Sequence, residues 1–281
     1  MINFAAYPTL SEEQWQQKIN SLADISYSPE ELQQVYRNIL SMVDLTTLEG
    51  SDTTPKVSAL CKKAYEIEDA GLHIPKVAAV CVYPTFVRQC KRELQGKEIH
   101  VASVAGAFPS GQSPLFVKLE EIKYAVDEGA DEIDMVISRG TFLEGDYQVV
   151  FYEIASIKKA CGASHLKVIL ETGELITPEN IRKASEIAIN AGGDFIKTST
   201  GKIQPAATEH AAVIMCETIK EYFEKTGKHI GFKPAGGIAD AATAVRYYNI
   251  VSSVLGKEWL NKNLFRFGAS RLVDNLINVI K

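Results

Sequence analysis

The chain has 281 residues, of which 46% are hydrophobic and 23% are charged, and its formal net charge is −5 at pH 7. These values are typical of a globular protein with one sizeable core, and they leave no basic surface for nucleic acid. No stretch approaches the roughly 18 apolar residues that a transmembrane helix requires. Nucleic-acid and membrane partners are therefore not expected.

The amino-terminal sequence MINFAAYPTLSEEQWQQKIN lacks the basic segment and apolar core of a secretory signal, so we expect a cytoplasmic protein. The five cysteines are Cys61, Cys81, Cys90, Cys161 and Cys216. Their odd number and the absence of CxxC spacing favour reduced thiols over disulfides or a zinc site. The five histidines, His73, His100, His165, His210 and His229, stand apart and are expected to be structural or on the surface. We expect no metal and no cofactor.

Two helix-like pieces, near residues 11–22 and 29–39, open the chain. They precede the first strand-like run, so we expect residues 1–39 to form a helical cap on the bottom or side of a domain formed by residues 40–281. No repeat, low-complexity tract or linker favours a further domain.

Short apolar or β-branched runs then alternate with longer stretches of helical periodicity. The eight runs are residues 40–48, 76–83, 98–106, 131–138, 165–173, 194–200, 229–237 and 264–270. Three of the helical stretches, 54–71, 113–129 and 177–192, open on Ser or Thr followed by Pro and end at Gly, as helix caps do. Eight strand–helix units in this length predict a single (β/α)8 TIM barrel, with a doubly wound open sheet as the alternative.

Charged residues recur in these strands opposite the apolar positions. Asp44, Asp134, Lys167, Lys197 and Lys233 each alternate with apolar neighbours. Because the apolar positions of a barrel face its helices, two carboxylates and three ammonium groups from five strands should converge inside. A structural ion network is one interpretation, since buried charges are costly unless paired. The position of several of them toward the carboxyl ends of the strands, where barrel active sites form, favours a catalytic interpretation.

Two of these lysines lie on consecutive strands, which suggests a chemistry. A lysine at its usual pKa of about 10.4 is protonated near neutral pH and is not nucleophilic. Desolvation and a second nearby cation both lower that pKa. Lys197 and Lys233 are therefore candidates for a Schiff-base lysine and its perturbing neighbour, and Asp134 for the proton shuttle.

Five motifs carry a resemblance to a known family: EIDMV, LKVILETGEL, GDFIKTSTGK, GFKPAGGI and FRFGAS. In this order and spacing they closely resemble the deoxyribose-phosphate aldolases, class I enzymes of deoxyribose catabolism. These enzymes reversibly cleave 2-deoxy-D-ribose 5-phosphate to acetaldehyde and D-glyceraldehyde 3-phosphate. The resemblance extends from about Val43 to Leu272.

The resemblance implies roles for individual residues. It implies that Lys197 forms the Schiff base, that Lys233 perturbs it, and that Asp134 is the acid/base partner. It also implies that Asp44 and Lys167 line the same site, with Lys167 pairing with the aspartate and helping to hold a water molecule. Family members are often dimers, so a homodimer is possible.

The loops after the seventh and eighth strands are candidates for phosphate binding, because backbone N–H groups of glycine-rich loops and helix N-termini bind anions. The candidates are Gly236, Gly237, Gly268 and Ser270, to which the resemblance adds Gly201 and, near the substrate, Lys202. The alternative is that these glycines only permit tight turns.

Two departures from the family pattern are informative. The family usually has arginine two residues after PAGG and a second hydroxyl residue after GAS, but this chain has Ala239 and Arg271 there. We expect Arg271 to replace the lost cation at the phosphate, the alternative being that it faces solvent. Many relatives also end in a tyrosine-bearing tail, whereas this sequence stops at NLINVIK, with Lys281 expected to be helical. Proton exchange at the enamine carbon is therefore expected to be slow.

Two other classes of function stay open from the chemistry of the residues alone. One is a lysine-lined barrel that binds a sugar phosphate without converting it. The other is a different Schiff-base lyase or transaldolase that acts on ketose phosphates. The family motifs favour the deoxyribose-phosphate aldolase.

Overall fold

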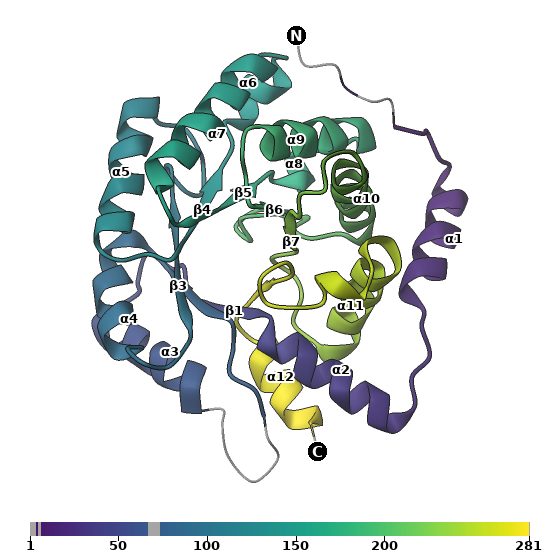
Figure 1. Ribbon diagram of the computed structural model, residues 1–281, viewed down its shortest axis with the longest axis horizontal. Coiled ribbons are helices and arrows are strands. Elements are labelled where there is room, and N and C mark those ends of the chain that lie inside the picture. The colour runs from purple at the N-terminus through teal and green to yellow at the C-terminus, as the bar shows by residue number, and fades with distance from the viewer. Residues whose placement is uncertain (1–3, 5–6, 67–73, 281) are drawn as a thin grey trace.

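The computed structural model describes Phe4, residues 7–66 and residues 74–280. A ring of strands lies at the centre, surrounded by helices (Figure 1). The strands are β1 (Val43–Thr46), β2 (Ala79–Val82), β3 (His100–Ala105), β4 (Glu132–Val136), β5 (His165–Ile169), β6 (Phe195–Lys197), β7 (Gly231–Lys233) and β8 (Phe267–Ala269). Consecutive strands from β1 to β7 pair in parallel, and β8 pairs in parallel with β1.

The ring closes between the seventh and eighth strands. Parallel bridges join Phe232 to Phe265 and Ala235 to Gly268, and the Arg266 N–H donates to the Phe232 carbonyl at 3.1 Å. A doubly wound sheet would leave two edge strands, so the predicted (β/α)8 barrel is confirmed and the open sheet is excluded.

The helices are α1 (Glu12–Ala23), α2 (Pro29–Ser41), α3 (Thr54–Glu66), α4 (Val87–Glu93), α5 (Leu115–Asp127), α6 (Arg139–Leu143), α7 (Tyr147–Cys161), α8 (Thr172–Leu175), α9 (Pro178–Asn190), α10 (Glu209–Thr226), α11 (Ala241–Leu255) and α12 (Leu272–Val279). Short 3-10 turns occupy Pro84–Phe86 and Lys257–Trp259. Helix α1 packs on α10 and α11, and α2 packs on α11 and α12, outside the barrel (Figure 1). In the described part of the chain, no helix is both long enough and apolar enough to cross a membrane.

The strands are shorter than the runs expected from the sequence, with three to six residues each. The run 165–173 illustrates the reason. Strand β5 ends at Ile169, Glu171 then adopts a left-handed conformation with φ of 58°, and α8 begins at Thr172. Residues beyond the paired segment therefore turn away into the loops above the barrel.

The expected helix caps are partly confirmed. Thr177 caps α9 by accepting a hydrogen bond from the Asn180 N–H at 3.1 Å. The expected cap at Ser113 is wrong, because α5 begins one residue later and the Pro114 carbonyl accepts its first helical hydrogen bonds. The expectations for residues 67–71, for His73 and for Lys281 lie outside the described residues.

The barrel interior accommodates an aromatic ring through a glycine on the neighbouring strand. Gly231 on β7 pairs with Phe195 on β6, and a Cβ atom at Gly231 would lie 2.3 Å from the Phe195 ring. The same ring lies 5.9 Å from the Lys167 ammonium and 6.0 Å from the Arg266 guanidinium. Gly231 therefore makes room for an aromatic floor beneath the charged groups described below.

We predict that Gly231→Ala destabilises the protein by about 1–3 kcal/mol, the usual cost of overpacking a filled core. The measurement is urea unfolding followed by circular dichroism. Gly50→Ala is the matched control, because a Cβ atom there meets no described atom within 4 Å. Equal stability of the two variants would contradict the packing argument.

Candidate active site

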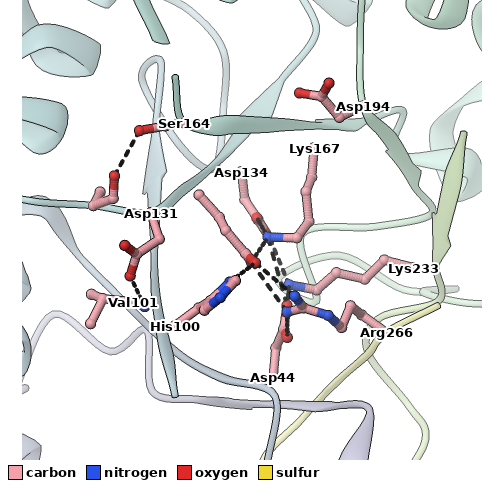
Figure 2. A network of polar contacts seen from close by, with 12 residues as sticks. Asp44, His100, Val101, Asp131, Asp134, Ser164, Lys167, Asp194, Lys233 and Arg266 are labelled. Atoms are coloured by element: carbon pink, nitrogen blue, oxygen red, sulfur yellow. Dashed lines mark hydrogen bonds and ion pairs between the residues drawn. The ribbon is translucent and has the colours of Figure 1, made fainter. Parts of the chain in front are cut away.

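Seven charged side chains meet inside the barrel, each at most 3% exposed. They are Asp44, Glu132, Asp134, Lys167, Lys197, Lys233 and Arg266. The first six come from strands β1, β4, β5, β6 and β7, and Arg266 directly precedes β8. Figure 2 shows Asp44, Asp134, Lys167, Lys233 and Arg266 pointing toward one another.

Asp134 is the centre of this charge network. Its Oδ1 accepts a hydrogen bond from Lys167 Nζ at 3.0 Å. Its Oδ2 accepts one from Lys197 Nζ at 2.8 Å and one from Lys233 Nζ at 2.7 Å. The structure therefore brings the three residues predicted to be catalytic into direct contact, and Lys167 pairs with Asp134 as the family resemblance implied.

A second layer of contacts holds this centre from below. Lys233 Nζ also donates to Asp44, and Lys167 Nζ also donates to Glu132. Arg266 bridges the two carboxylates: Nη1 donates to Asp44 Oδ1 at 2.6 Å, and Nη2 donates to Glu132 Oε1 at 2.7 Å. Every charged group in this layer is thus paired, as buried charges require.

Sequence reasoning missed Glu132 and Arg266, although the signal was present. Glu132 lies two residues before Asp134 and Arg266 two residues before Gly268, so the period of two already placed both on the inner face. His100, which was expected to be structural or on the surface, is partly exposed and also contacts this network. Its Nδ1 lies 2.8 Å from Glu132 Oε1, at the start of β3, while 41% of its side chain stays exposed.

The three interior lysines differ in pKa because their surroundings differ. Burial lowers the pKa of Lys197, and the Lys233 ammonium adds to this effect, so that Asp134 only partly offsets it. Burial acts in the same direction on Lys233 and Lys167, but each has several carboxylate neighbours, which raise the pKa overall. Lys197 is therefore the lysine closest to a free amine, and Lys233 stays an ammonium group.

The carboxylates remain ionised near neutral pH. Burial alone would raise the pKa of Asp134, but the ammonium groups of Lys167, Lys197 and Lys233 hold it well below its usual range. Glu132 and Asp44 also have lowered pKa values, because Lys167, Lys233 and Arg266 outweigh the effect of burial. Asp134 can therefore accept a proton, but it carries none at rest.

A cavity of about 440 Å³ opens above this network at the carboxyl ends of the strands. Its lining includes all the residues proposed for the phosphate: Gly201, Lys202, Gly236, Gly237, Gly268, Ser270 and Arg271. Lys197 also lines it, so this one side chain belongs both to the charge network and to the cavity. The cavity gives a small molecule access to the Lys197 amine.

Glycine is required in this cavity for two reasons. Gly201, Gly236 and Gly237 have φ values of 80°, 80° and 82°, a conformation that other residues rarely adopt. A Cβ atom at Gly236 would also lie 2.7 Å from Ala206 Cβ and 2.9 Å from Gly201 Cα. These glycines therefore permit the tight turns that line the cavity, and phosphate binding by these turns stays a prediction.

Three cationic side chains line the cavity besides Lys197, namely Lys56, Lys202 and Arg271. Lys202 Nζ donates to Glu49 Oε1 at 2.9 Å across the mouth. Arg271 directly precedes α12 and is exposed. The Ala239 carbonyl accepts a hydrogen bond from Asn275 Nδ2 at 2.7 Å, which ties the loop after β7 to α12. The two positions that depart from the family pattern therefore border one cavity.

A further buried carboxylate shapes the loop after β6. Glu171 is fully buried and accepts hydrogen bonds from the Thr200 N–H at 3.1 Å and from the Thr200 hydroxyl. Arg139 Nη1 donates to the same carboxylate at 3.2 Å. Thr200 Oγ1 in turn accepts a hydrogen bond from the Lys202 N–H at 3.1 Å. Sequence reasoning named neither Glu171 nor Thr200, and no periodicity distinguishes loop residues.

The fold and these side chains define a (β/α)8-barrel enzyme with a lysine-centred site. The family model described as DeoC/LacD family aldolase matches residues 38–248. The chain therefore belongs to the DeoC/LacD aldolase family, which confirms the resemblance seen in the motifs.

Individual relatives agree with this assignment. A putative deoxyribose-phosphate aldolase of Caenorhabditis elegans is 47% identical over 245 residues, which cover 86% of this chain and 80% of that protein. The deoxyribose-phosphate aldolase of Homo sapiens is 47% identical over 247 residues, which cover 84% and 78%. The crystal structure of a putative deoxyribose-phosphate aldolase from Coccidioides immitis has a TM-score of 0.72 and 27% identity, and the match covers 95% of this chain and 98% of that chain.

The depressed carboxylate pKa values predict how stability depends on pH. Because the pKa of Asp134 is lower in the folded than in the unfolded protein, its contribution is complete above the unfolded value of about 3.9 and is lost as the pH falls below it. Asp134→Asn leaves ammonium groups buried without their partner and should cost about 3–5 kcal/mol at pH 7. This gap in the free energy of unfolding between wild type and Asp134→Asn should be smaller at pH 3.

Urea unfolding of wild type and Asp134→Asn at pH 7 and pH 3 measures the gap. Asp127→Asn, at an exposed position of α5, is the control and should change the free energy of unfolding little at either pH. A gap of the same size at both pH values would rule out the proposed charge state of Asp134.

Proposed function

We propose that this protein is a class I aldolase that reversibly cleaves 2-deoxy-D-ribose 5-phosphate to acetaldehyde and D-glyceraldehyde 3-phosphate. The observation that carries the proposal is Lys197, a buried lysine with a lowered pKa that touches both Asp134 and the cavity. The relatives named deoxyribose-phosphate aldolase support the substrate. The homodimer and the cytoplasmic location stay predictions.

The reaction begins with the Lys197 amine. It adds to the C1 aldehyde of the open-chain sugar to give a carbinolamine, which loses water to form an imine. Asp134, 2.8 Å from the Lys197 Nζ, is placed to accept and return the protons of these steps. Lys233 stays charged through its contacts with Asp134 and Asp44, so it favours the free amine of its neighbour.

Bond cleavage follows from the imine. The C3 hydroxyl loses its proton, the C2–C3 bond breaks, and its electron pair forms the enamine of acetaldehyde while D-glyceraldehyde 3-phosphate leaves. Protonation of the enamine carbon regenerates an imine, and water hydrolyses it to acetaldehyde and the free Lys197 amine. Asp134 is the carboxylate nearest to the nitrogen and is therefore our choice for the proton transfers.

The phosphate of the substrate fits the far end of the cavity. The turns at Gly201 and Gly237 and the start of α12 border this end, and their N–H groups are our candidates for donors to an anion. Lys202 and Arg271 add positive charge at the same end. We propose that the backbone groups bind the phosphate and that the two side chains strengthen the contact.

Lys197→Leu tests the nucleophile directly. The variant should lose turnover and should no longer be labelled when acetaldehyde and borohydride are added, because Lys197 is the lysine of the buried charge network that lines the cavity. Wild type should gain one reduced ethyl group at Lys197 by peptide mass spectrometry. Lys225→Leu, at an exposed position of α10, is the control and should be labelled like wild type. Labelling of Lys197→Leu at another lysine would show that the nucleophile is misassigned.

Arg271→Ser tests the relocated cation. If Arg271 contacts the phosphate, KM for deoxyribose 5-phosphate should rise about ten-fold, which corresponds to roughly 1.4 kcal/mol and is close to the value of a charge-assisted hydrogen bond. Cleavage of unphosphorylated deoxyribose should keep its rate. Equal effects on both substrates, or none on either, would assign the phosphate to the backbone groups and Lys202.

A further inference from the structure

The charges buried inside the barrel do not cancel when every group is ionised. Three carboxylates, Asp44, Glu132 and Asp134, face four cationic side chains, Lys167, Lys197, Lys233 and Arg266. The network is therefore neutral when one of the four cations has lost its proton, and it carries one positive charge when none has. A net charge in a buried, poorly solvated region is costly, so the neutral state is favoured.

We propose that Arg266 and Glu132 are positioning residues that set this balance, so that the barrel interior is neutral when Lys197 carries a free amine. The proposal deepens the proposed function, because it rests on Lys197 as the imine-forming lysine. Neither residue lines the cavity, and both act on Lys197 through other side chains.

Two chains of contacts connect the pair to Lys197. Arg266 Nη1 donates to Asp44 at 2.6 Å, Asp44 pairs with Lys233, and Lys233 donates to Asp134 at 2.7 Å. On the other side, Glu132 pairs with Lys167, which donates to Asp134 at 3.0 Å. Figure 2 shows the charged ends of Lys167, Lys233 and Arg266 meeting near the carboxylates of Asp44 and Asp134. Both chains end at the carboxylate that Lys197 contacts.

Three further titratable groups lie around the network or at the mouth of the cavity. Cys81 on β2 is neutral near pH 7, because burial raises the pKa of its thiol to about 11. His100 on β3 contacts Glu132 at the far end of the network and has a half-exposed side chain, which water solvates. At the mouth of the cavity, Lys202 is paired with Glu49. The sum over the seven interior groups therefore decides the charge state.

The pKa directions agree with the count. Lys197 is the cation of the network whose pKa burial lowers overall. Burial also disfavours the charged forms of Lys167, Lys233 and Arg266, but two or three carboxylates around each raise the pKa. Lys197 hydrogen-bonds with Asp134, which it shares with two other ammonium groups. It is therefore the group that gives up the proton.

The proposal predicts opposite effects for the two residues. Glu132→Gln removes a negative charge, so the Lys197 amine should become free at lower pH. Arg266→Met removes a positive charge, so the amine should become free only at higher pH. Each shift should be about one pH unit, which is the coupling of two charges roughly 10 Å apart at an effective dielectric constant near 20. The double variant should return to the wild-type midpoint.

The experiment measures the initial rate of cyanoborohydride trapping of the acetaldehyde imine from pH 5 to pH 10, with the site of labelling read by peptide mass spectrometry. Circular dichroism at each pH confirms that the variants are folded. Arg266→Lys keeps the charge and should keep the wild-type midpoint even if it lowers stability. Glu153→Gln removes a buried carboxylate that pairs with Lys118 outside the barrel interior, and it should also leave the midpoint in place.

A failure of the proposed function and a failure of the roles of Arg266 and Glu132 give different results. Absence of trapping at Lys197 in wild type would overturn the proposed function itself. Trapping in wild type with unmoved midpoints, or with both variants moved in the same direction, would overturn the role of Arg266 and Glu132. If Arg266→Met does not fold, Glu132→Gln decides alone: a midpoint equal to or above that of wild type contradicts the proposal.

Discussion

The site depends on one carboxylate that three ammonium groups share. Asp134 accepts hydrogen bonds from Lys167, Lys197 and Lys233, all inside the barrel and shielded from water. The single negative charge of Asp134 cannot neutralise three ammonium groups, so the three lysines compete for this carboxylate. The two that also contact a second carboxylate, Lys167 and Lys233, keep their protons. The remaining lysine, Lys197, is the one whose pKa is lowered, and it lines the cavity.

This competition explains why identical side chains at neighbouring positions behave differently. Lys197 and Lys233 pair directly across β6 and β7, at the same level of the barrel. Asp44 reaches Lys233 from β1, and Arg266 holds Asp44 in place at 2.6 Å. The opposite pKa shifts of these two lysines thus arise from partners on strands that are distant in the sequence.

The two halves of the site use charge in different ways. Inside the barrel, fully buried ion pairs hold the charged side chains in place and set their protonation states. At the carboxyl ends of the strands, glycine turns line the cavity, and contacts such as that between Glu171 and Thr200 hold the shape of the loop after β6. Backbone donors keep their polarity at every pH, whereas the ion pairs of the interior depend on protonation.

Eight strand–helix units in the sequence predicted the barrel, and a period of two predicted the inner face of its strands, because it assigns every second side chain to one side. Asp44, Asp134, Lys167, Lys197 and Lys233 follow from that rule, and the glycines of the turns follow from chain geometry. The contacts among these inner residues could not be predicted in this way, because they depend on how the strands are placed around the ring. That Arg266 bridges Asp44 to Glu132, and that His100 reaches Glu132, depends on the stagger of the strands around a closed barrel. The charge state of Lys197 was likewise decided there, because it is a property of seven groups brought together by five strands and a loop rather than of any one segment.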